Sequence, residues 1–396
     1  MTLRIFARPF PEYDPFRAFY TMKGLLDRSR NRFYNHFINW MKEQRVNMKQ
    51  RKNFFDAARV GVALLVVALL ALWWIYRYYE TRSESSTTFV MDTVMQQNVY
   101  GPRAKEAIQQ VTDRIASMES ELSLYEETSD IARLNAAAGE SFVELSSETY
   151  QLLEHAKTLS AQAPDAFAIT IAPLTLAWGI ITESPRVPTQ EEIDELLPLV
   201  DDQALILRDG QGMLEKKGQA VDLGGIAKGA ACDAAAAIYD ELKVENALLN
   251  LGGSTIYARG TKPDGTAFRI GFRDPAGDQS SALLSFSLQN AVFSTSGGYE
   301  RFFEQDGVRY QHILDPQTGW PVQSDLLSVG VLMENGAEAD FYSTALFAMG
   351  RDKALEYMQK GISAILLDEE GTLYVSSVFR DSLELLTDDY QVVYVE

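Results

Sequence analysis

An uncharged, strongly apolar run divides the chain into two parts of opposite charge. Residues 60–76 (VGVALLVVALLALWWIY) hold no charged side chain, and Arg59 and Arg77 bound the run. A helix rises about 1.5 Å per residue, so this run, extended to Tyr79, just spans the hydrocarbon core of a bilayer. The run therefore predicts a transmembrane helix over residues 60–79.

The charges on either side of this run predict its orientation. Residues 1–59 carry a net charge of +8, and residues 80–396 carry −28. Basic loops stay in the cytoplasm, so we expect a single-pass protein of the cytoplasmic membrane, with its N-terminus inside and its body outside. The acidic body also argues against a nucleic-acid partner, because phosphate backbones bind to basic surfaces.

The N-terminal part leaves two alternatives open. The apolar run could belong to a cleaved signal peptide, but it is long for one and no small-x-small cleavage site follows, which favours an uncleaved anchor. Residues 1–47 are basic and aromatic, and either lie on anionic lipid or precede a true start at Met48. The expected division is a basic cytoplasmic segment (1–59), a transmembrane anchor (60–79), a polar linker (80–88) and one large domain (89–396).

Hydrophobic periodicity predicts a mixed order of helices and hairpins in the large domain. Helices are expected over 104–122, 146–163, 337–349 and 352–360, and a capping box at Thr189 and Glu192 is expected to open another. Strands are expected over 89–95, 268–273, 283–288 and 246–256, the last broken at Gly252 and Gly253, and hairpin turns at 305–307 and 369–371. This order holds no regular βαβ repeat, which favours an α+β fold with a largely antiparallel sheet. The single cysteine, Cys232, excludes an intrachain disulfide and a cysteine-based metal site.

The segment Val221–Ala230 (VDLGGIAKGA) predicts a strand, a glycine turn and the start of a helix. Gly224 and Gly225 allow the backbone to approach a ligand closely, and a helix N-terminus attracts an anion such as phosphate. Lys228 lies in the first helical turn, where a bound phosphate would explain a cation. The alternative is a plain turn with a solvated lysine, because the segment fits neither known glycine-rich phosphate loop.

This segment contains the first of five motifs that occur in a fixed order. They are Asp222–Gly229 (DLGGIAKG), Asn250–Gly253 (NLGG), Ser294–Gly297 (STSG) with Tyr299–Arg301 (YER), His312–Gly319 (HILDPQTG) and Ala339–Ala345 (ADFYSTA). In this order and spacing they resemble the ApbE family, the FAD:protein FMN transferases, from about Thr88 to the C-terminus. The resemblance implies an α+β fold of the ApbE or T-fold-like type, with largely antiparallel sheets flanked by helices.

The resemblance also implies a reaction, in which the FMN half of FAD passes to a threonine or serine hydroxyl of another protein and AMP is released. The acceptors would be proteins of membrane-linked electron transfer. Such a transfer needs a cation for the pyrophosphate, a base for the hydroxyl and a preformed cleft. Two alternatives stay open: an FAD pyrophosphatase giving FMN and AMP, and a non-catalytic, membrane-anchored FAD-binding protein.

Asp340 and Thr344 are the candidate metal ligands. Their i, i+4 spacing stacks two oxygens on one face of a helix. Oxygen ligands suit Mg²⁺, which shares substrate phosphates instead of being fully caged by protein. The resemblance adds Ser343 and a backbone oxygen near Gly225. Without the other motifs, the pair would indicate only an exposed helix start.

His312 is the candidate base. It precedes a tight turn that contains Asp315 and Gly319. A histidine can take the proton of an incoming hydroxyl near neutral pH, and the resemblance gives this role to His312. Asp315 would orient the imidazole or brace the loop, and the alternative is a structural histidine in a turn.

The resemblance implies FAD-binding roles for residues of several segments. They are Met91, Tyr125, Ala166, Phe167, Ala168, Asp222, Lys228 and Ile313. Tyr125 would lie over the nucleotide, and Asp222 would bond its adenine or ribose side. Ala168 stands where the family commonly has an aspartate, so one polar contact is missing here. Residues 297–301 would frame the incoming protein or brace the histidine loop.

Overall fold

The computed structural model describes residues 31–278 and 281–396. The chain divides into two compact units, with the boundary in the sequence between Tyr76 and Arg77. Of the segment 1–47, for which we expect either contact with anionic lipid or a later start, residues 1–30 lie outside the described part of the chain. The first described element is one long helix, α2 (Asn31–Thr81). Its stretch Asn35–Ile75 is long and apolar enough to cross a membrane, and a signal sequence would meet the same criterion.

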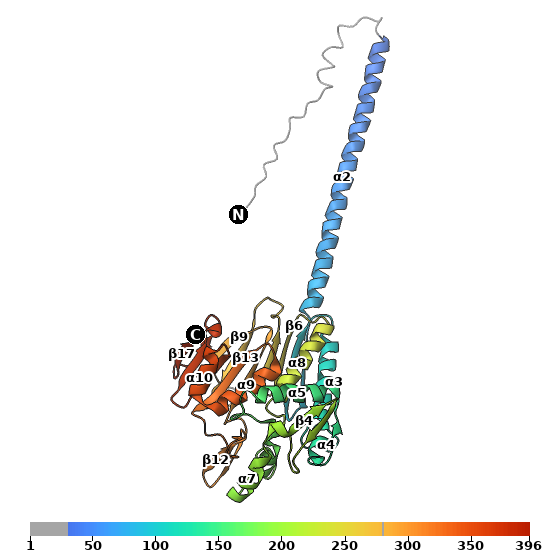
Figure 1. The fold of residues 1–396 in the computed structure, drawn as a ribbon. Helices are drawn as coiled ribbons and strands as arrows, with labels where there is room; N and C mark the ends of the chain where they lie inside the picture. Colours follow the sequence, from blue (N-terminus) through green and yellow to red (C-terminus); the bar gives the residue numbers. More distant parts are fainter. Residues whose placement is uncertain (1–30, 279–280) are drawn as a thin grey trace. The chain divides into compact units, whose positions relative to one another are not determined.

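A nine-stranded sheet forms the centre of the second unit (Figure 1). Its order is β1-β2-β6-β7-β10-β13-β14-β15-β17, and every neighbouring pair is antiparallel except β15 and β17. The strands are β1 (Ser83–Val90), β2 (Thr93–Tyr100), β6 (Asn246–Leu251), β7 (Thr255–Arg259), β10 (Ala291–Gly297), β13 (Leu326–Met333), β14 (Ser363–Asp368), β15 (Thr372–Ser376) and β17 (Gln391–Val395). The predicted α+β fold is confirmed.

The two faces of this sheet are covered differently. One face packs on helices α3 (Ala104–Leu122), α5 (Ser147–Ser160), α8 (Ala227–Glu241), α9 (Gly336–Met349) and α10 (Arg351–Gln359) (Figure 1). The other face packs on a small sheet of β8 (Phe268–Arg273), β9 (Ala282–Leu288) and β16 (Glu384–Leu385). Alternate side chains of each central strand therefore enter two separate apolar cores.

Shorter elements complete the unit. They are α4 (Asp130–Ala136), β3 (Val143–Glu144), η2 (Ile169–Ile171), α6 (Ala172–Trp178), α7 (Gln190–Leu196), η3 (Leu197–Leu199), η4 (Asp202–Ala204), β4 (Leu205–Arg208), β5 (Gln211–Leu214), β11 (Phe302–Gln305), β12 (Val308–Gln311) and η5 (Ser377–Phe379). Strands β11 and β12 form the hairpin predicted at residues 305–307. The capping box at Thr189 and Glu192 also forms and starts α7.

The break expected at Gly252 and Gly253 within residues 246–256 is present, and it separates two paired strands, β6 and β7. Two other segments differ from the prediction. Residues 83–88 form most of β1, not a polar linker, because their backbone pairs along its whole length with β2. The strand expected over 89–95 is a hairpin that turns at Met91 and Asp92.

The strand predicted before Asp222 is also absent. Val221 instead pairs with one side chain: its N–H donates to Asn135 Oδ1 at 2.7 Å, and its carbonyl accepts from Asn135 Nδ2 at 3.0 Å. The N–H of Asp222 donates to the carbonyl of Ile169 at 2.7 Å. A side-chain amide can satisfy a peptide group as a neighbouring strand would, so the segment is extended without belonging to a sheet.

Helices α8 and α9 cross at two glycines, and this crossing fixes the position of the Asp340 helix. A Cβ placed on Gly229 would lie 1.9 Å from the carbonyl oxygen of Gly336. We expect Gly229→Ala to destabilise the fold by about 3 kcal/mol, because backbone cannot yield as a side chain can. Urea unfolding would measure this loss, and Ala230→Gly, one residue along the same helix, is the control. Equal stability of Gly229→Ala and wild type would contradict the close crossing.

Candidate functional site

A pocket of about 450 Å³ opens where the β1–β2 turn, the glycine turn before α8, the end of β10 and the loop after β12 meet. Twelve of the fourteen residues predicted for the site line it. They are Met91, Tyr125, Ala166, Phe167, Ala168, Asp222, Gly225, Lys228, His312, Ile313, Asp340 and Thr344. The other two, Asp315 and Ser343, do not line it. Residues far apart in sequence thus converge on one cavity, as a ligand site requires.

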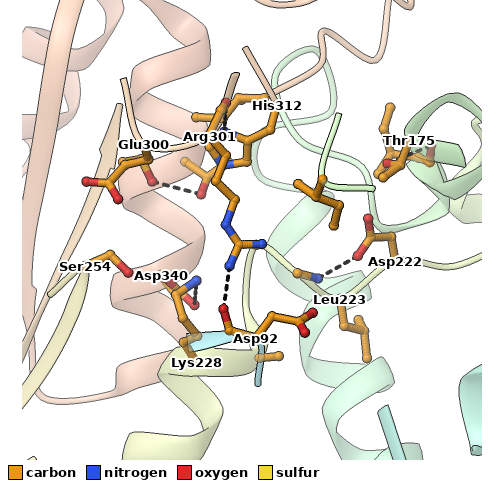
Figure 2. A pocket seen from close by; sticks show the side chains of 18 of the residues that line it. Asp92, Thr175, Asp222, Leu223, Lys228, Ser254, Glu300, Arg301, His312 and Asp340 are labelled. Carbon is orange, nitrogen blue, oxygen red and sulfur yellow. Dashed lines mark hydrogen bonds and ion pairs between the residues drawn. The ribbon is translucent and has the colours of Figure 1, made fainter. Parts of the chain in front are cut away.

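Asp340 is the most buried carboxylate of this pocket, at 3% exposure. Its Oδ1 accepts hydrogen bonds from Ser294 Oγ at 2.7 Å and Thr255 Oγ1 at 3.4 Å. Its Oδ2 accepts from Gly229 N at 3.0 Å and lies 3.9 Å from Lys228 Nζ (Figure 2). A buried charge needs such partners. The network fixes the carboxylate at the pocket wall.

The donor set around Asp340 fits a hard cation. Thr344 lies one helical turn after Asp340 on α9. A Cβ added to Gly225 would lie 3.8 Å from Thr344 Oγ1 and 2.8 Å from the ring of Phe167. Glycine at 225 therefore lets the backbone approach both side chains. Among the described residues, no three His, Cys, Asp or Glu side chains group closely enough to cage a metal. The oxygens of Asp340, Thr344 and Gly225 suit Mg²⁺, which takes its remaining ligands from phosphate and water.

Ser343 makes a different set of contacts from Thr344. Its hydroxyl donates to the carbonyl of Asp340 at 2.9 Å and shares a hydrogen bond with Ser296 Oγ at 2.9 Å. Ser296 also shares one with Thr344 Oγ1 at 3.1 Å. Ser343 is fully buried, so its contacts orient the Asp340–Thr344 turn from behind.

His312 lies half-buried on the wall opposite α8, and its tautomer follows from one contact. The ring Nδ1 is 3.1 Å from the carbonyl of Arg301. A carbonyl only accepts, so Nδ1 carries the proton and Nε2 is the free basic nitrogen. Burial, followed by the positive charges of Arg301 and Lys228, lowers the pKa of His312 to about 4. The ring is therefore neutral at pH 7.

Asp315 braces the loop and does not orient the imidazole. Its carboxylate accepts from the N–H of Gln317 at 2.8 Å, and its own N–H donates to the carbonyl of Trp320 at 2.8 Å. The orienting contact on His312 comes from Arg301. Of the two roles expected for Asp315, the structure thus shows contacts for loop bracing alone.

Asp222 and Asp340 occupy opposite sides of the pocket (Figure 2). The carboxylate of Asp222 accepts from the N–H of Gly224 at 2.8 Å. Burial raises the pKa of Asp222, against the hydrogen bonds of Gly224 and Thr175 and the charge of Lys228, which lower it. With Lys228 beside Asp340, the two sides of the pocket differ in charge and suit different parts of one long ligand.

Glu119, which sequence reasoning missed, and Arg301 of the predicted YER motif hold the β1–β2 turn over the pocket. Glu119 Oε1 accepts from the N–H of Met91 at 2.9 Å, and Arg301 donates to the carbonyl of Asp92 at 3.3 Å (Figure 2). Glu119 lies on the amphipathic helix α3 and has the spacing of a solvated side chain. Only the docking of the hairpin on α3 gives it this role, so no sequence signal pointed to it.

Comparison with known proteins gives one consistent family. Residues 91–366 match the model of the ApbE family. The FAD:protein FMN transferase of Klebsiella pneumoniae is 33% identical over 70% of this chain and 87% of its own length, and that of Treponema pallidum is 30% identical over 77% and 90%. The solved ApbE protein of Thermotoga maritima, 31% identical, superposes with a TM-score of 0.70 over 76% of this chain and 98% of its own. For the flavin transferase ApbE of Vibrio cholerae, 26% identical, the TM-score is 0.69 over 76% and 99%.

Proposed function

Because the chain belongs to the ApbE family, we propose that it transfers FMN from FAD to a threonine or serine hydroxyl of another protein, with Mg²⁺ as cofactor. One observation carries the proposal: the oxygen set around Asp340 and the unprotonated Nε2 of His312 belong to the same pocket. Diphosphate chemistry needs both a cation site and a base.

The chain's own residues account for the proton and for the binding of the substrate. The acceptor hydroxyl oxygen attacks the FMN phosphorus of FAD, its proton passes to His312 Nε2, and the bond from that phosphorus to AMP breaks. Lys228 attracts the pyrophosphate, and Asp222 accepts hydrogen bonds from the adenosine side. Mg²⁺, held by Asp340, Thr344 and the Gly225 carbonyl, would neutralise charge on the phosphates. The aromatic and apolar wall of Tyr125, Phe167 and Ile313 suits the flavin rings.

The reaction is proposed to take place outside the cytoplasmic membrane. The apolar helix α2 and the contrast between a basic N-terminal segment and an acidic body support an anchor with the body outside. Protease added to intact spheroplasts would then degrade the body. Protection of the body until the membrane is lysed would contradict this orientation.

The direct test of the proposal is the mass of an acceptor protein. Full-length enzyme in detergent is incubated with FAD, Mg²⁺ and a flavin-carrying subunit of a membrane electron-transfer complex, prepared without its flavin. We expect the acceptor to gain the mass of one FMN less water, with one AMP released per adduct. FMN and AMP without an adduct would instead indicate a pyrophosphatase, and intact bound FAD would indicate a carrier.

A further inference from the structure

One cation of the reaction pocket has no carboxylate partner. Arg301 lines the pocket and is exposed. Every other arginine in the described residues 82–278 and 281–396 forms a salt bridge with an aspartate or a glutamate. The body is acidic, so carboxylates are plentiful around it. An arginine held in a pocket without one can bind an anion that a ligand brings.

The guanidinium of Arg301 has hydrogen-bond donors to spare. An arginine side chain carries five N–H groups in a planar fork. Among the described residues, one hydrogen bond engages them: Nη2 donates to the carbonyl of Asp92 at 3.3 Å (Figure 2). This distance is long for an N–H···O bond, so the contact is weak. The remaining donors of the fork match the oxygens of a phosphate group.

Arg301 and His312 stand together at the foot of the β11–β12 hairpin. Arg301 directly precedes β11, and His312 directly follows β12. The carbonyl of Arg301 accepts from the backbone N–H of His312 at 3.1 Å and lies 3.1 Å from its Nδ1. After burial, the charge of Arg301 is the largest cause that lowers the pKa of His312. The guanidinium and the proposed base therefore share one anchor and lie near each other.

The charges that line the pocket restrict where a diphosphate can bind. Of the described residues that line it, five are carboxylates, which repel phosphate, and two are cations. The carboxylates are Asp92, Glu119, Asp222, Glu300 and Asp340, and the cations are Lys228 and Arg301. Lys228 Nζ is 3.9 Å from Asp340 Oδ2 and so belongs with the proposed metal ligands.

The two cations of the pocket can therefore hold two different phosphates. Arg301 lies with the base, whereas Lys228 lies with Asp340. The hydroxyl that gives its proton to His312 must at the same time reach the phosphorus that it attacks, so these groups lie within contact of one another. The phosphate next to Arg301 is then the one under attack, which is the FMN phosphate.

We propose that Arg301 is a catalytic residue that binds the FMN phosphate of FAD, with its guanidinium N–H groups donating to the non-bridging oxygens. This assignment rests on the proposed transferase function and adds a residue to its mechanism. Negative charge stays on these oxygens throughout a phosphoryl transfer, and a fixed cation beside them stabilises the transition state. One residue then serves two groups: its side chain holds the phosphate under attack, and its carbonyl keeps His312 in the tautomer that accepts the proton.

The test compares two flavins that differ by one phosphate. FMN and riboflavin are titrated into full-length enzyme in detergent, with EDTA present so that no metal contributes, and binding is followed by flavin fluorescence. We expect wild type to bind FMN about 30-fold more tightly than riboflavin, and Arg301→Gln to reduce this preference to about threefold or less. The Kd for riboflavin should stay within about twofold, because riboflavin has no phosphate. Arg301→Lys keeps a point charge without the fork and should keep part of the preference.

The same variant also reports on catalysis. At saturating FAD and Mg²⁺, Arg301→Gln should lower kcat for transfer to an acceptor protein by roughly 10²-fold. Arg309→Gln is the matched control, because Arg309 belongs to the same hairpin, is paired with Glu304 at 3.3 Å and does not line the pocket. Its preference for FMN and its kcat should stay within about twofold of wild type.

Each contrary result identifies what has failed. An unchanged FMN preference or an unchanged kcat in Arg301→Gln would overturn the inference. An equal loss of FMN and riboflavin binding would also overturn it, since Arg301 would then only brace the β1–β2 turn. A wild type that modifies an acceptor but does not prefer FMN to riboflavin refutes the inference alone. A wild type that binds neither flavin and modifies no acceptor refutes the proposed function with it.

Discussion

Asp340→Asn is expected to reduce FMN transfer by about 10³-fold. The carboxylate supplies the only negative charge of the proposed oxygen set, and an amide cannot replace it. Its Nδ2 would also face either Gly229 N–H or the Ser294 hydroxyl, so the network that fixes the side chain is disturbed as well. Steady-state AMP release and intact acceptor mass, both followed across a Mg²⁺ titration, measure the loss.

Asp233→Asn controls for the loss of a half-buried carboxylate that links the same two helices. Asp233 on α8 accepts from the N–H groups of Gly336 and Ala337 at 2.6 and 2.9 Å and does not line the pocket. We expect it to lower the melting temperature and to leave the activity of the folded fraction within about threefold. Transfer by Asp340→Asn within tenfold of wild type, at any Mg²⁺ concentration, would refute the metal assignment.

His312→Gln is expected to lower kcat by roughly 10²- to 10⁴-fold, the range for loss of a general base. Glutamine removes the imidazole and so the basic nitrogen, and its flexible amide can still donate to the carbonyl of Arg301. His312→Asn, whose Nδ2–H lies at the position of Nδ1, is the companion variant that best keeps this contact and the loop conformation. FAD affinity, measured by flavin fluorescence, should therefore change little. A variant that loses FAD binding and transfer together would show that His312 holds the substrate instead of activating the hydroxyl.

The pH profile gives a second readout of His312. A base must be unprotonated, and the pKa of His312 is lowered to about 4, so kcat/KM should be constant near neutral pH and fall only as the pH approaches about 4. Bound FAD adds negative charge, so the acid limb of kcat should lie at higher pH. Arg301→Gln removes a positive charge while keeping the carbonyl that holds Nδ1, and should also move the limb upward. A limb unaffected by Arg301→Gln would contradict this electrostatic coupling.

The sequence alone determined those features that depend on neighbours along the chain. The i, i+4 spacing of Asp340 and Thr344, the capping box of Thr189 and the apolar run over 60–76 are all local patterns, and the structure contains each as a helix or a helix start. The order of the motifs also indicated the family. Periodicity and capping act within a few residues, so they can be recognised without knowledge of the tertiary fold.

Only the tertiary structure decided which distant groups share a contact. Asp340 meets Ser294 and Thr255 because β10 and β7 are neighbours in the sheet, and His312 takes its tautomer from Arg301 because the β11–β12 hairpin brings their backbones together. The same reason explains why residues 83–88, which were expected to form a linker, belong to β1. A polar segment has no local preference that distinguishes linker from strand, and pairing with β2 supplies the hydrogen bonds that make it a strand.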